Sequence, residues 1–525
     1  MSPSAAGARV AAIPARQKQL IDLLLLLSSV LLFYLAFPGG GIAELAWFAI
    51  IPVIIALDKS HKKYAFMLGL LAATLGWMVS IWWAVGGIAK ISAIPENLVV
   101  PVIFIYCLYS ALPYALVTWL HSRCGWGRSI GGAIKSALAL TVLVNFVPQL
   151  LPGNLAHALY LTPLQIQLAD IGGVPLVFFV LHCVNFLLAA GVLLWRSQRQ
   201  KSLGCFILAA VVFLANLAYG AVKTDRIADK LARENTRLTL AMIQPNLDIS
   251  LRTREAWLAK RETMRALIQE AEKQQLVDLM VVPELPVPLS YKNYLEDRHF
   301  FDEIKGHGDL LLTAIQPLDK SRDSDAGYFN TMELISGGQV SHQYFKQKLL
   351  PLGEYLPFEQ QLPFLRGWFP GAANYQSGQE FQLLPLAVAG GVNILPLICY
   401  EAVFSDFVGV GVGLGGNLLV NTVNDAWFGQ SPGGKVHLAL SLFRAVEYRL
   451  PLVRATNTGI TGIIDPGGNI IPESQIMPYQ AGYSVTQVKL ATIGSFYQAN
   501  PNVFKYICLL FLGFALITGM GKKNA

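Results

Sequence analysis

The stretch Leu397-Ile398-Cys399-Tyr400-Glu401-Ala402-Val403-Phe404 is the segment around which the rest of this chain is organised. The apolar run 394–398 predicts a buried strand, which stops at a cysteine followed by a tyrosine and a glutamate. Because α/β proteins present reactive side chains at strand ends, Cys399 is a candidate nucleophile with the carboxylate of Glu401 close by. A buried cysteine is more often structural, so that alternative stays open at this point.

The composition of the chain predicts a membrane protein. Of its 525 residues, 54% are hydrophobic and only 14% are charged, whereas about 25% of the residues of soluble proteins are charged. Uncharged apolar runs of roughly 20 residues are long enough to cross a bilayer as helices. We therefore predict eight membrane-spanning helices, at residues 20–37, 42–57, 64–85, 98–120, 130–151, 174–195, 204–222 and 502–519.

The basic residues predict how these helices are oriented. One set of short loops and tails holds thirteen Lys and Arg residues, and the opposite short loops (86–97 and 152–173) hold only Lys90. Because basic loops stay in the cytoplasm, we expect both ends of the chain there and the block before the last span on the outer side of the membrane. The net charge of +7 follows from this asymmetry and implies no nucleic-acid partner.

Residues 236–495 alternate short apolar runs with amphipathic ones, which predicts that this outer block is one extracytoplasmic α/β domain. Gly337 and Gly338 predict a hairpin between two of its strands. The chain is thus expected to comprise a membrane domain with seven helices (1–222), this outer domain (236–495) and an eighth spanning helix (502–519). The expected strands are 238–244, 277–282, 310–315, 329–335, 340–345, 394–398, 417–423, 452–456 and 462–464, and the expected helices are 252–273 and 436–449.

The distribution of cysteines strengthens the case for a reactive thiol. Of the six cysteines, four lie in predicted spans and Cys124 lies in a cytoplasmic loop, so Cys399 is the single cysteine of the outer domain. It has no intramolecular disulfide partner in an oxidising compartment, where an unpaired thiol is a liability unless the protein uses it.

Two further polar side chains end predicted strands and supply what a thiol nucleophile needs. Glu284 follows the strand 277–282, and Lys346 follows the strand 340–345. A carboxylate can act as the base and an ammonium can stabilise an oxyanion. Taken alone, Glu284 is equally typical of a capping acid and Lys346 of a solvated lysine. Together, strands that end in Glu284, Lys346 and Cys399 predict a site along one edge of a sheet.

The segments Val282-Pro283-Glu284, Lys346-x-Lys348-Leu-Leu-Pro-Leu-Gly-Glu354 and Ile398-Cys399-Tyr400-Glu401 resemble the Glu-Lys-Cys motifs of the nitrilase superfamily. With its eight predicted spans, the whole chain is similar to the apolipoprotein N-acyltransferase family. The similarity extends through Asn424-Asp425-Ala426-Trp427-Phe428-Gly429, Arg444-Ala445-x-Glu447 and Arg454-Ala455-x-Asn457-Thr458-Gly459.

This resemblance implies an α-β-β-α sandwich on the outer face of the inner membrane. It also implies a reaction that moves an acyl chain from a phospholipid to the α-amine of a lipoprotein's diacylglyceryl-cysteine. Cys399 would be the nucleophile, Glu284 the general base and Lys346 the oxyanion stabiliser, with no metal or organic cofactor. By the same resemblance, the supporting residues are Glu354, Tyr400 and Glu401.

The chain departs from the family pattern at several positions near these motifs. Val282 replaces a common Trp, Lys348 replaces a common His, and Val436 replaces a usual Gln before His437. Arg252 occupies the spacing at which a Trp is common. None of these departures removes Glu284, Lys346 or Cys399, but they affect the expected substrate contacts.

The segment 362–371 is unusually apolar for a loop and contains Pro and Gly hinges. We predict that it is a lid at the membrane interface that admits acyl chains, although a loop packed into the core is an equal alternative. Its candidate lipid contacts, with one from the later motif, are Phe364, Trp368, Phe369 and Trp427.

Two other functions remain open from the sequence. One is a membrane-tethered amidase of the nitrilase type, in which water attacks the thioester; eight spans argue against it because one span suffices as a tether. The other is a transporter or receptor with a ligand-binding outer domain, which the scarcity of ionisable residues within the spans disfavours.

Overall fold

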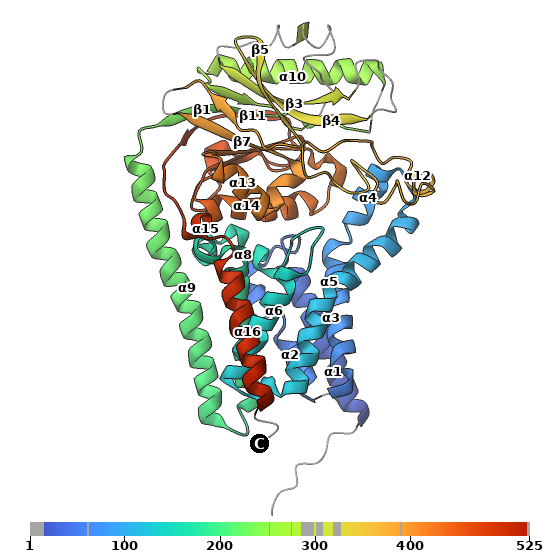
Figure 1. Ribbon diagram of the computed structural model, residues 1–525, viewed down its shortest axis with the longest axis vertical. Helices are drawn as coiled ribbons and strands as arrows, with labels where there is room; N and C mark the ends of the chain where they lie inside the picture. The colour runs from blue at the N-terminus through green and yellow to red at the C-terminus, as the bar shows by residue number, and fades with distance from the viewer. Residues whose placement is uncertain are drawn as a thin grey trace, which may run out of the picture.

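The computed structural model describes residues 15–59, 62–250, 253–274, 276–284, 299–300, 308–318, 327–388 and 391–521. Figure 1 shows a layer of long helices below and an α/β domain above. The first helix begins and the last helix ends at the lower side of the helical layer, away from the α/β domain. The helical layer comprises α1 (Ala15–Ala36), α2 (Ile51–Lys59), α3 (Ala65–Ile81), α4 (Ala84–Ser92), α5 (Glu96–Cys124), α6 (Ile130–Phe146), α7 (Pro163–Ile166), α8 (Ala169–Leu194), α9 (Arg199–Arg233) and α16 (Val503–Gly521).

Several helices of this layer are long and apolar enough to cross a membrane. Among the described residues there are four such helices, α1, α5, α8 and α9, and a fifth span if α3 and α4, bent by 63°, count as one. Helices α6 and α16 are apolar but shorter within the described residues. The predicted span 42–57 is divided between a 3₁₀ turn, η1 (Ala43–Trp47), and the nine-residue α2.

The α/β domain contains two sheets that face each other. The six-stranded sheet has the order β11-β1-β2-β3-β4-β5, and the five-stranded sheet has the order β10-β9-β8-β7-β6. The first is formed by β1 (Arg237–Gln244), β2 (Leu279–Val281), β3 (Asp309–Pro317), β4 (Tyr328–Ser336), β5 (Gln339–Phe345) and β11 (Gly482–Lys489). The second is formed by β6 (Leu384–Leu386), β7 (Val392–Ile398), β8 (Leu418–Val423), β9 (Leu452–Thr456) and β10 (Gly462–Ile464).

Helices cover the outer face of each sheet, which confirms the expected α-β-β-α layers. Helix α10 (Arg254–Gln274) lies over the six-stranded sheet, and α13 (Ser405–Gly413) and α14 (Gly433–Tyr448) lie between the five-stranded sheet and the helical layer (Figure 1). Strand β1 shows why: Leu240 and Met242 pack between the sheets, while Ala241 and Ile243 pack under α10. Alternate residues of a strand point to opposite faces, so a strand with both faces covered is apolar throughout.

The structure confirms the predicted strands and the hairpin but corrects where the site lies. Strands β4 and β5 pair antiparallel across Gly337-Gly338, as expected. The short β6 and the C-terminal β11, which pairs with β1, were not predicted. The strands that precede Glu284 and Lys346 belong to one sheet and the strand that precedes Cys399 belongs to the other. The expectation of a site along one sheet edge is therefore wrong, because the site lies between two sheets.

A break in α8 joins the helical layer to the α/β domain. Gly172 and Gly173 depart from helical backbone angles, and Gly173 has a φ of +66°. A Cβ atom at Gly173 would lie 2.6 Å from the ring of Tyr497 and 3.2 Å from a carboxylate oxygen of Glu447. The glycine therefore permits the close approach in which the N–H of Val174 donates to Glu447 on α14 at 3.0 Å.

A buried ion pair makes a second connection between the two parts. The carboxylate of Asp170, on α8, lies 2.9 Å from the guanidinium of Arg449 and 2.8 Å from the ammonium of Lys223 on α9. The side chains of Asp170 and Arg449 are 1% exposed. A buried charge without its partner is costly, so this pair stabilises the junction only while both partners are present.

Replacing Asp170 by Ala is expected to destabilise the protein by about 3 kcal/mol or more, because the charge of Arg449 stays buried without its carboxylate. Thermal unfolding of the purified protein in detergent, followed by tryptophan fluorescence, measures this loss. The matched control is Asp58→Ala, which removes an ion pair whose partner, Arg128, is 53% exposed, and which should cost about 1 kcal/mol or less. Equal losses in the two variants would contradict the role of the buried pair.

Candidate active site

Cys399 lies where β7 ends and a short 3₁₀ turn, η6 (Cys399–Val403), begins. Its φ of +52° is in the left-handed region, which residues with a side chain rarely adopt. Two donors fix its carbonyl oxygen: the amide of Asn421 at 3.2 Å and a ring nitrogen of His437 at 3.2 Å. The side chain is half-buried. The turn thus presents the thiol at the end of the strand instead of continuing along it.

The ammonium of Lys346 joins two carboxylates. It lies 3.1 Å from Oε1 of Glu284 and 2.7 Å from Oε1 of Glu354. The amide nitrogen of Asn330 donates to the same two oxygens, at 2.9 and 3.3 Å. Oε2 of Glu354 accepts the backbone N–H of Leu350 at 2.8 Å. An ammonium and an amide therefore fix two acidic side chains in one orientation.

Glu401 connects the sheet that carries Lys346 to the turn that carries Cys399. Its Oε2 accepts the N–H of Ile398 at 2.8 Å. Its Oε1 accepts the hydroxyl of Tyr344 at 2.7 Å and two backbone N–H groups directly after Lys346, those of Gln347 and Lys348, at 2.7 and 3.1 Å. Glu401 is fully buried, and burial raises its pKa to about 7 although the donated hydrogen bonds oppose that shift.

The charges around the site set the protonation of Cys399 and Lys346. Burial, and next the charge of Glu284, raise the pKa of the Cys399 thiol well above its ordinary value. Burial alone would lower the pKa of Lys346, but Glu284 and Glu354 raise it well above its ordinary value. The resting site therefore holds a neutral thiol beside an ammonium, and the thiol needs a base before it can attack.

A second buried group of charges lies beneath the nucleophile. His437 meets Oδ1 of Asp425 at 3.0 Å with one ring nitrogen and the carbonyl oxygen of Cys399 with the other. Arg454 lies 2.9 Å from Oδ2 of Asp425 and donates to Asn421 at 2.8 Å. Burial would raise the pKa of Asp425, but Arg454 and His437 hold it below its ordinary value. Both ring nitrogens of His437 are therefore engaged, one by the carboxylate of Asp425 and one by the carbonyl oxygen of Cys399.

The structure brings together five of the six predicted residues, namely Glu284, Lys346, Glu354, Cys399 and Glu401. Tyr400 differs: its ring packs against Phe404 with centroids 4.7 Å apart, and its hydroxyl donates to the carbonyl of Leu150 in the helical layer. Sequence reasoning missed Asn330, Asn421 and His437 as site residues. Asn421 and His437 lie within or beside segments already recognised as motifs, whereas Asn330 lies in a strand with no distinctive pattern.

Three of the four candidate lipid contacts lie on or beside one short helix, and the fourth lies on another element. Phe364 directly precedes α12 (Leu365–Trp368) and Trp368 ends it; their rings stack edge to face at 5.2 Å, and the two residues are 54% and 64% exposed. Phe369, directly after α12, is half-buried. Trp427 lies in the 3₁₀ turn η7 (Asp425–Phe428), which packs against α4. In Figure 1 α12 also lies beside α4 at one side of the molecule.

The departures from the family pattern have different surroundings. Val282 is buried under α10, and Val436 is buried on α14 directly before His437. Lys348 donates its backbone N–H to Glu401, so its role in that bond does not depend on its side chain. Arg252 lies outside the described residues.

Two facing sheets that present Glu284, Lys346 and Cys399 define a domain of the carbon-nitrogen hydrolase class, and residues 239–498 match that family. Residues 29–187 match the apolipoprotein N-acyltransferase N-terminal domain. The chain belongs to the apolipoprotein N-acyltransferase family.

Known relatives agree with this assignment along most of the chain. An apolipoprotein N-acyltransferase of Geobacter metallireducens is 30% identical over 98% of this chain and 96% of its own. Another, of Brucella melitensis, is 30% identical over 76% of this chain and 77% of its own. Among solved structures, a mutant amidase of the nitrilase superfamily from Nesterenkonia AN1 covers 49% of this chain and 91% of its own at 18% identity and a TM-score of 0.35.

Replacing Glu401 by Gln should slow acylation of Cys399 by about 100-fold, because an amide cannot accept all four hydrogen bonds and the turn shifts relative to Lys346. Intact-protein mass spectrometry measures the acylation rate. The matched control is Glu262→Gln on α10, whose carboxylate is largely exposed and pairs with Arg265 of its own helix. A Glu401→Gln variant with the wild-type rate would show that the carboxylate does not align the site.

The raised pKa of Cys399 predicts slow alkylation at neutral pH. Iodoacetamide reacts with the thiolate, whose fraction rises about tenfold per pH unit below the pKa. The rate at Cys399 should therefore keep rising between pH 7 and 9, measured by peptide mass spectrometry with Cys399→Ser as the background control. A plateau reached below pH 8 would contradict a neutral resting thiol.

Proposed function

We propose that the chain transfers an acyl group through a thioester at Cys399. The observation that carries this proposal is that Glu284, Lys346 and Glu354 form one group of ion pairs in segments that follow strands of the six-stranded sheet, opposite the neutral thiol of Cys399 at the end of a strand of the other sheet. Glu284 removes the proton of the thiol as its sulfur attacks the ester carbonyl of a phospholipid. The C–S bond forms, the C–O bond to the glycerol breaks, and Glu284 returns the proton to the leaving oxygen.

Lys346 stabilises the oxyanion that forms in this step. An ammonium has three N–H donors, and its bonds to the described residues use two of them, for Glu284 and Glu354. The third is available for the oxygen of the tetrahedral intermediate. Glu354 accepts from the Lys346 ammonium, and the amide of Asn330 donates to both Glu284 and Glu354. These bonds keep Lys346 and Glu284 in place.

In the second step the α-amine of a lipoprotein's diacylglyceryl-cysteine attacks the thioester. Glu284 takes a proton from the amine, the C–N bond forms, and the C–S bond breaks to return the thiol. An amine attacks a thioester readily, so no metal or organic cofactor is required for either half of the reaction. The acceptor is a lipoprotein because the relatives named above are apolipoprotein N-acyltransferases.

We infer that the chain spans the inner membrane eight times, with seven spans in residues 1–222 and the eighth at 502–519. Both ends would be cytoplasmic and the catalytic domain, residues 236–495, periplasmic. Two observations support this: basic residues gather on one set of loops, and α1 begins on the side of the helical layer where α16 ends, opposite the α/β domain (Figure 1).

The lipid substrates are proposed to enter at the side of the α/β domain formed by α4, α12 and η7. Phe364 and Trp368 expose aromatic surface there, as expected of side chains that rest in the membrane interface. Phe369 and Trp427, less exposed, would contact the acyl chain further inside. Arg366 forms an ion pair with Glu359, which fixes the base of this segment.

Mass spectrometry of the purified protein tests the acyl transfer. Incubation with phospholipid should add one acyl group to Cys399, and a diacylated lipopeptide should then remove it as an amide. Glu284→Gln should slow acylation by about 100-fold or more, and Cys399→Ala should abolish it. Cys124→Ala is the matched control, because Cys124 is an exposed thiol on the helical layer.

The outcomes separate the alternatives. Discharge of the acyl group to water alone would favour a hydrolase of the amidase type. The absence of any adduct, with the cellular phenotype unchanged in Cys399→Ser, would contradict an acyl-enzyme and favour transport or binding.

A further inference from the structure

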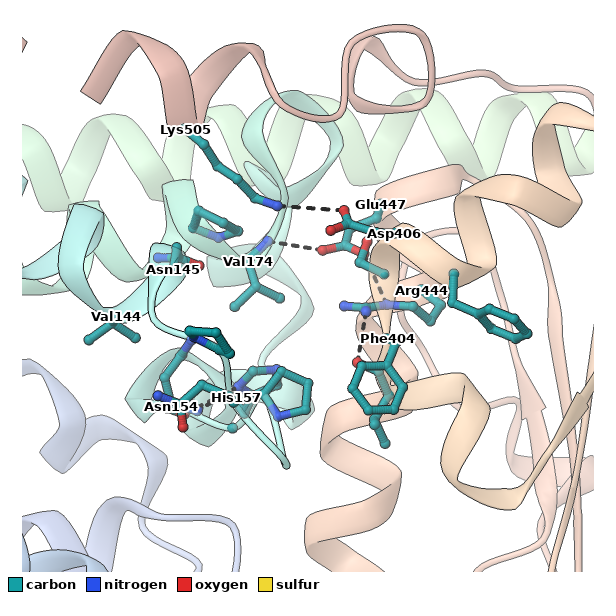
Figure 2. Close-up of a pocket in the computed structure, with 18 of the residues that line it drawn as sticks. Val144, Asn145, Asn154, His157, Val174, Phe404, Asp406, Arg444, Glu447 and Lys505 are labelled. Carbon is teal, nitrogen blue, oxygen red and sulfur yellow. Dashed lines mark hydrogen bonds and ion pairs between the residues drawn. The ribbon is translucent and has the colours of Figure 1, made fainter. Parts of the chain in front are cut away.

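A cavity of about 520 Å³ lies where the α/β domain meets the helical layer. One wall is formed by α13, α14 and the turn after Cys399, and the other by the end of α6, the segment that follows it, and the start of α8. Figure 2 shows Arg444 and Phe404 on one side, with Asn145, Asn154 and His157 on the other. None of Glu284, Lys346 and Cys399 lines the cavity, so it is separate from the proposed catalytic centre.

Cationic groups face the cavity from three elements. Arg444 on α14 is 3% exposed, and its guanidinium is directed toward the cavity (Figure 2). Lys505 reaches over the cavity from α16, and Lys348 lines it from the segment after β5. Among the described residues no carboxylate lies within ion-pair distance of the Lys348 ammonium. The cavity thus gathers three positive charges from distant parts of the chain.

The acidic residues of the cavity leave part of this charge uncompensated. The carboxylate of Glu447 is engaged on every side: it pairs with Arg444 at 2.9 Å and accepts from Ser405 at 2.6 Å and from the N–H of Val174 at 3.0 Å. Asp406 pairs with Lys505 only at 3.5 Å, and its side chain is 69% exposed. The Lys505 side chain is 18% exposed, so only the carboxylate end of this long pair is freely solvated, and that end can move away at little cost.

An exposed apolar surface continues from the cavity along the helical layer. Phe146 at the end of α6 and Tyr506 on α16 lie with ring centroids 6.5 Å apart, 45% and 55% exposed. Leu510, one turn further along α16, is 73% exposed, and Val410 on α13 is 52% exposed at the cavity itself. The cavity holds cationic side chains, whereas the surface beside it is apolar. This is the arrangement that a headgroup and its acyl chains require.

We propose that this cavity binds the phosphate-bearing headgroup of a membrane lipid, whose acyl chains lie along α6 and α16. The phosphate is bound by the cationic side chains of Lys505, Lys348 and Arg444. Asp406 faces the ammonium or hydroxyl group at the end of the headgroup. The proposal rests on the membrane placement given under the proposed function. Lipid bound here would be a second molecule, held on the other side of the Cys399–Val403 turn from the reacting thiol.

A photoreactive lipid tests the site in the full-length protein. The probe is a phosphatidylethanolamine with two ether-linked chains and a diazirine beside the headgroup; its ether bonds prevent transfer to Cys399. Peptide mass spectrometry should find the crosslink on the segments 144–154, 405–410 and 503–510. Lys505→Gln should reduce the crosslink there about fivefold, and Val410→Trp, which fills the cavity from an exposed position, should abolish it.

Competition identifies the source of the phosphate. An unlabelled diether phospholipid should displace the probe, whereas a diether glycerol without phosphate and soluble glycerol phosphate should not. Lys230→Gln is the matched control, because Lys230 is an exposed lysine of α9 that donates to the carbonyl of Ile493; it should label as the wild type does.

Three results would overturn the proposal. Unchanged labelling in both Lys505→Gln and Val410→Trp would show that the cavity is not the site. If the diether glycerol competes as well as the diether phospholipid, the site is an apolar groove that does not recognise phosphate. If glycerol phosphate competes as well, the site binds a free phosphate ester and not a lipid. The thioester at Cys399 is measured separately, so its absence would overturn the proposed function without affecting these readouts.

Discussion

The rest of the site depends on the hydrogen bonds that the side chain of Glu401 accepts. It accepts hydrogen bonds from both sheets at once: from Tyr344 and the two residues after Lys346 on one side, and from Ile398, next to Cys399, on the other. The strands before Glu284 and Lys346 belong to one sheet, and the strand before Cys399 belongs to the other. No hydrogen-bonded ladder therefore joins the thiol to the two charged groups. A single buried carboxyl group therefore sets the separation between Cys399 and the ion pair of Glu284 with Lys346.

The helical layer contributes to this geometry through charges as well as through apolar packing. The lower helices of the α/β domain contact α8 through Asp170 with Arg449 and through Val174 with Glu447. Glu447 also binds Ser405 and Arg444, and Arg444 donates to the carbonyl of Val403 at the end of the nucleophile's turn. A continuous series of polar contacts thereby joins the helical layer to the end of the turn that begins at Cys399.

Local pattern was sufficient to predict the strand ends that carry Glu284, Lys346 and Cys399, because apolar runs followed by polar residues are visible in a short window. It was not sufficient to predict that these strands divide between two sheets, since that depends on pairings such as β1 with β11, far apart in the sequence. The same limit applies to His437 and Asn421. Their importance lies in the carbonyl of Cys399 that they contact, and spacing along the chain does not reveal such a contact.

The left-handed backbone at Cys399 has a consequence for the evolution of such a site. A residue with a side chain costs about 1 kcal/mol or more in this conformation, and glycine does not. The chain gives up this stability to place a sulfur atom at the turn, and two donors to the carbonyl oxygen keep the strained peptide from relaxing. Selection for a more stable fold alone would therefore favour glycine over cysteine at this position.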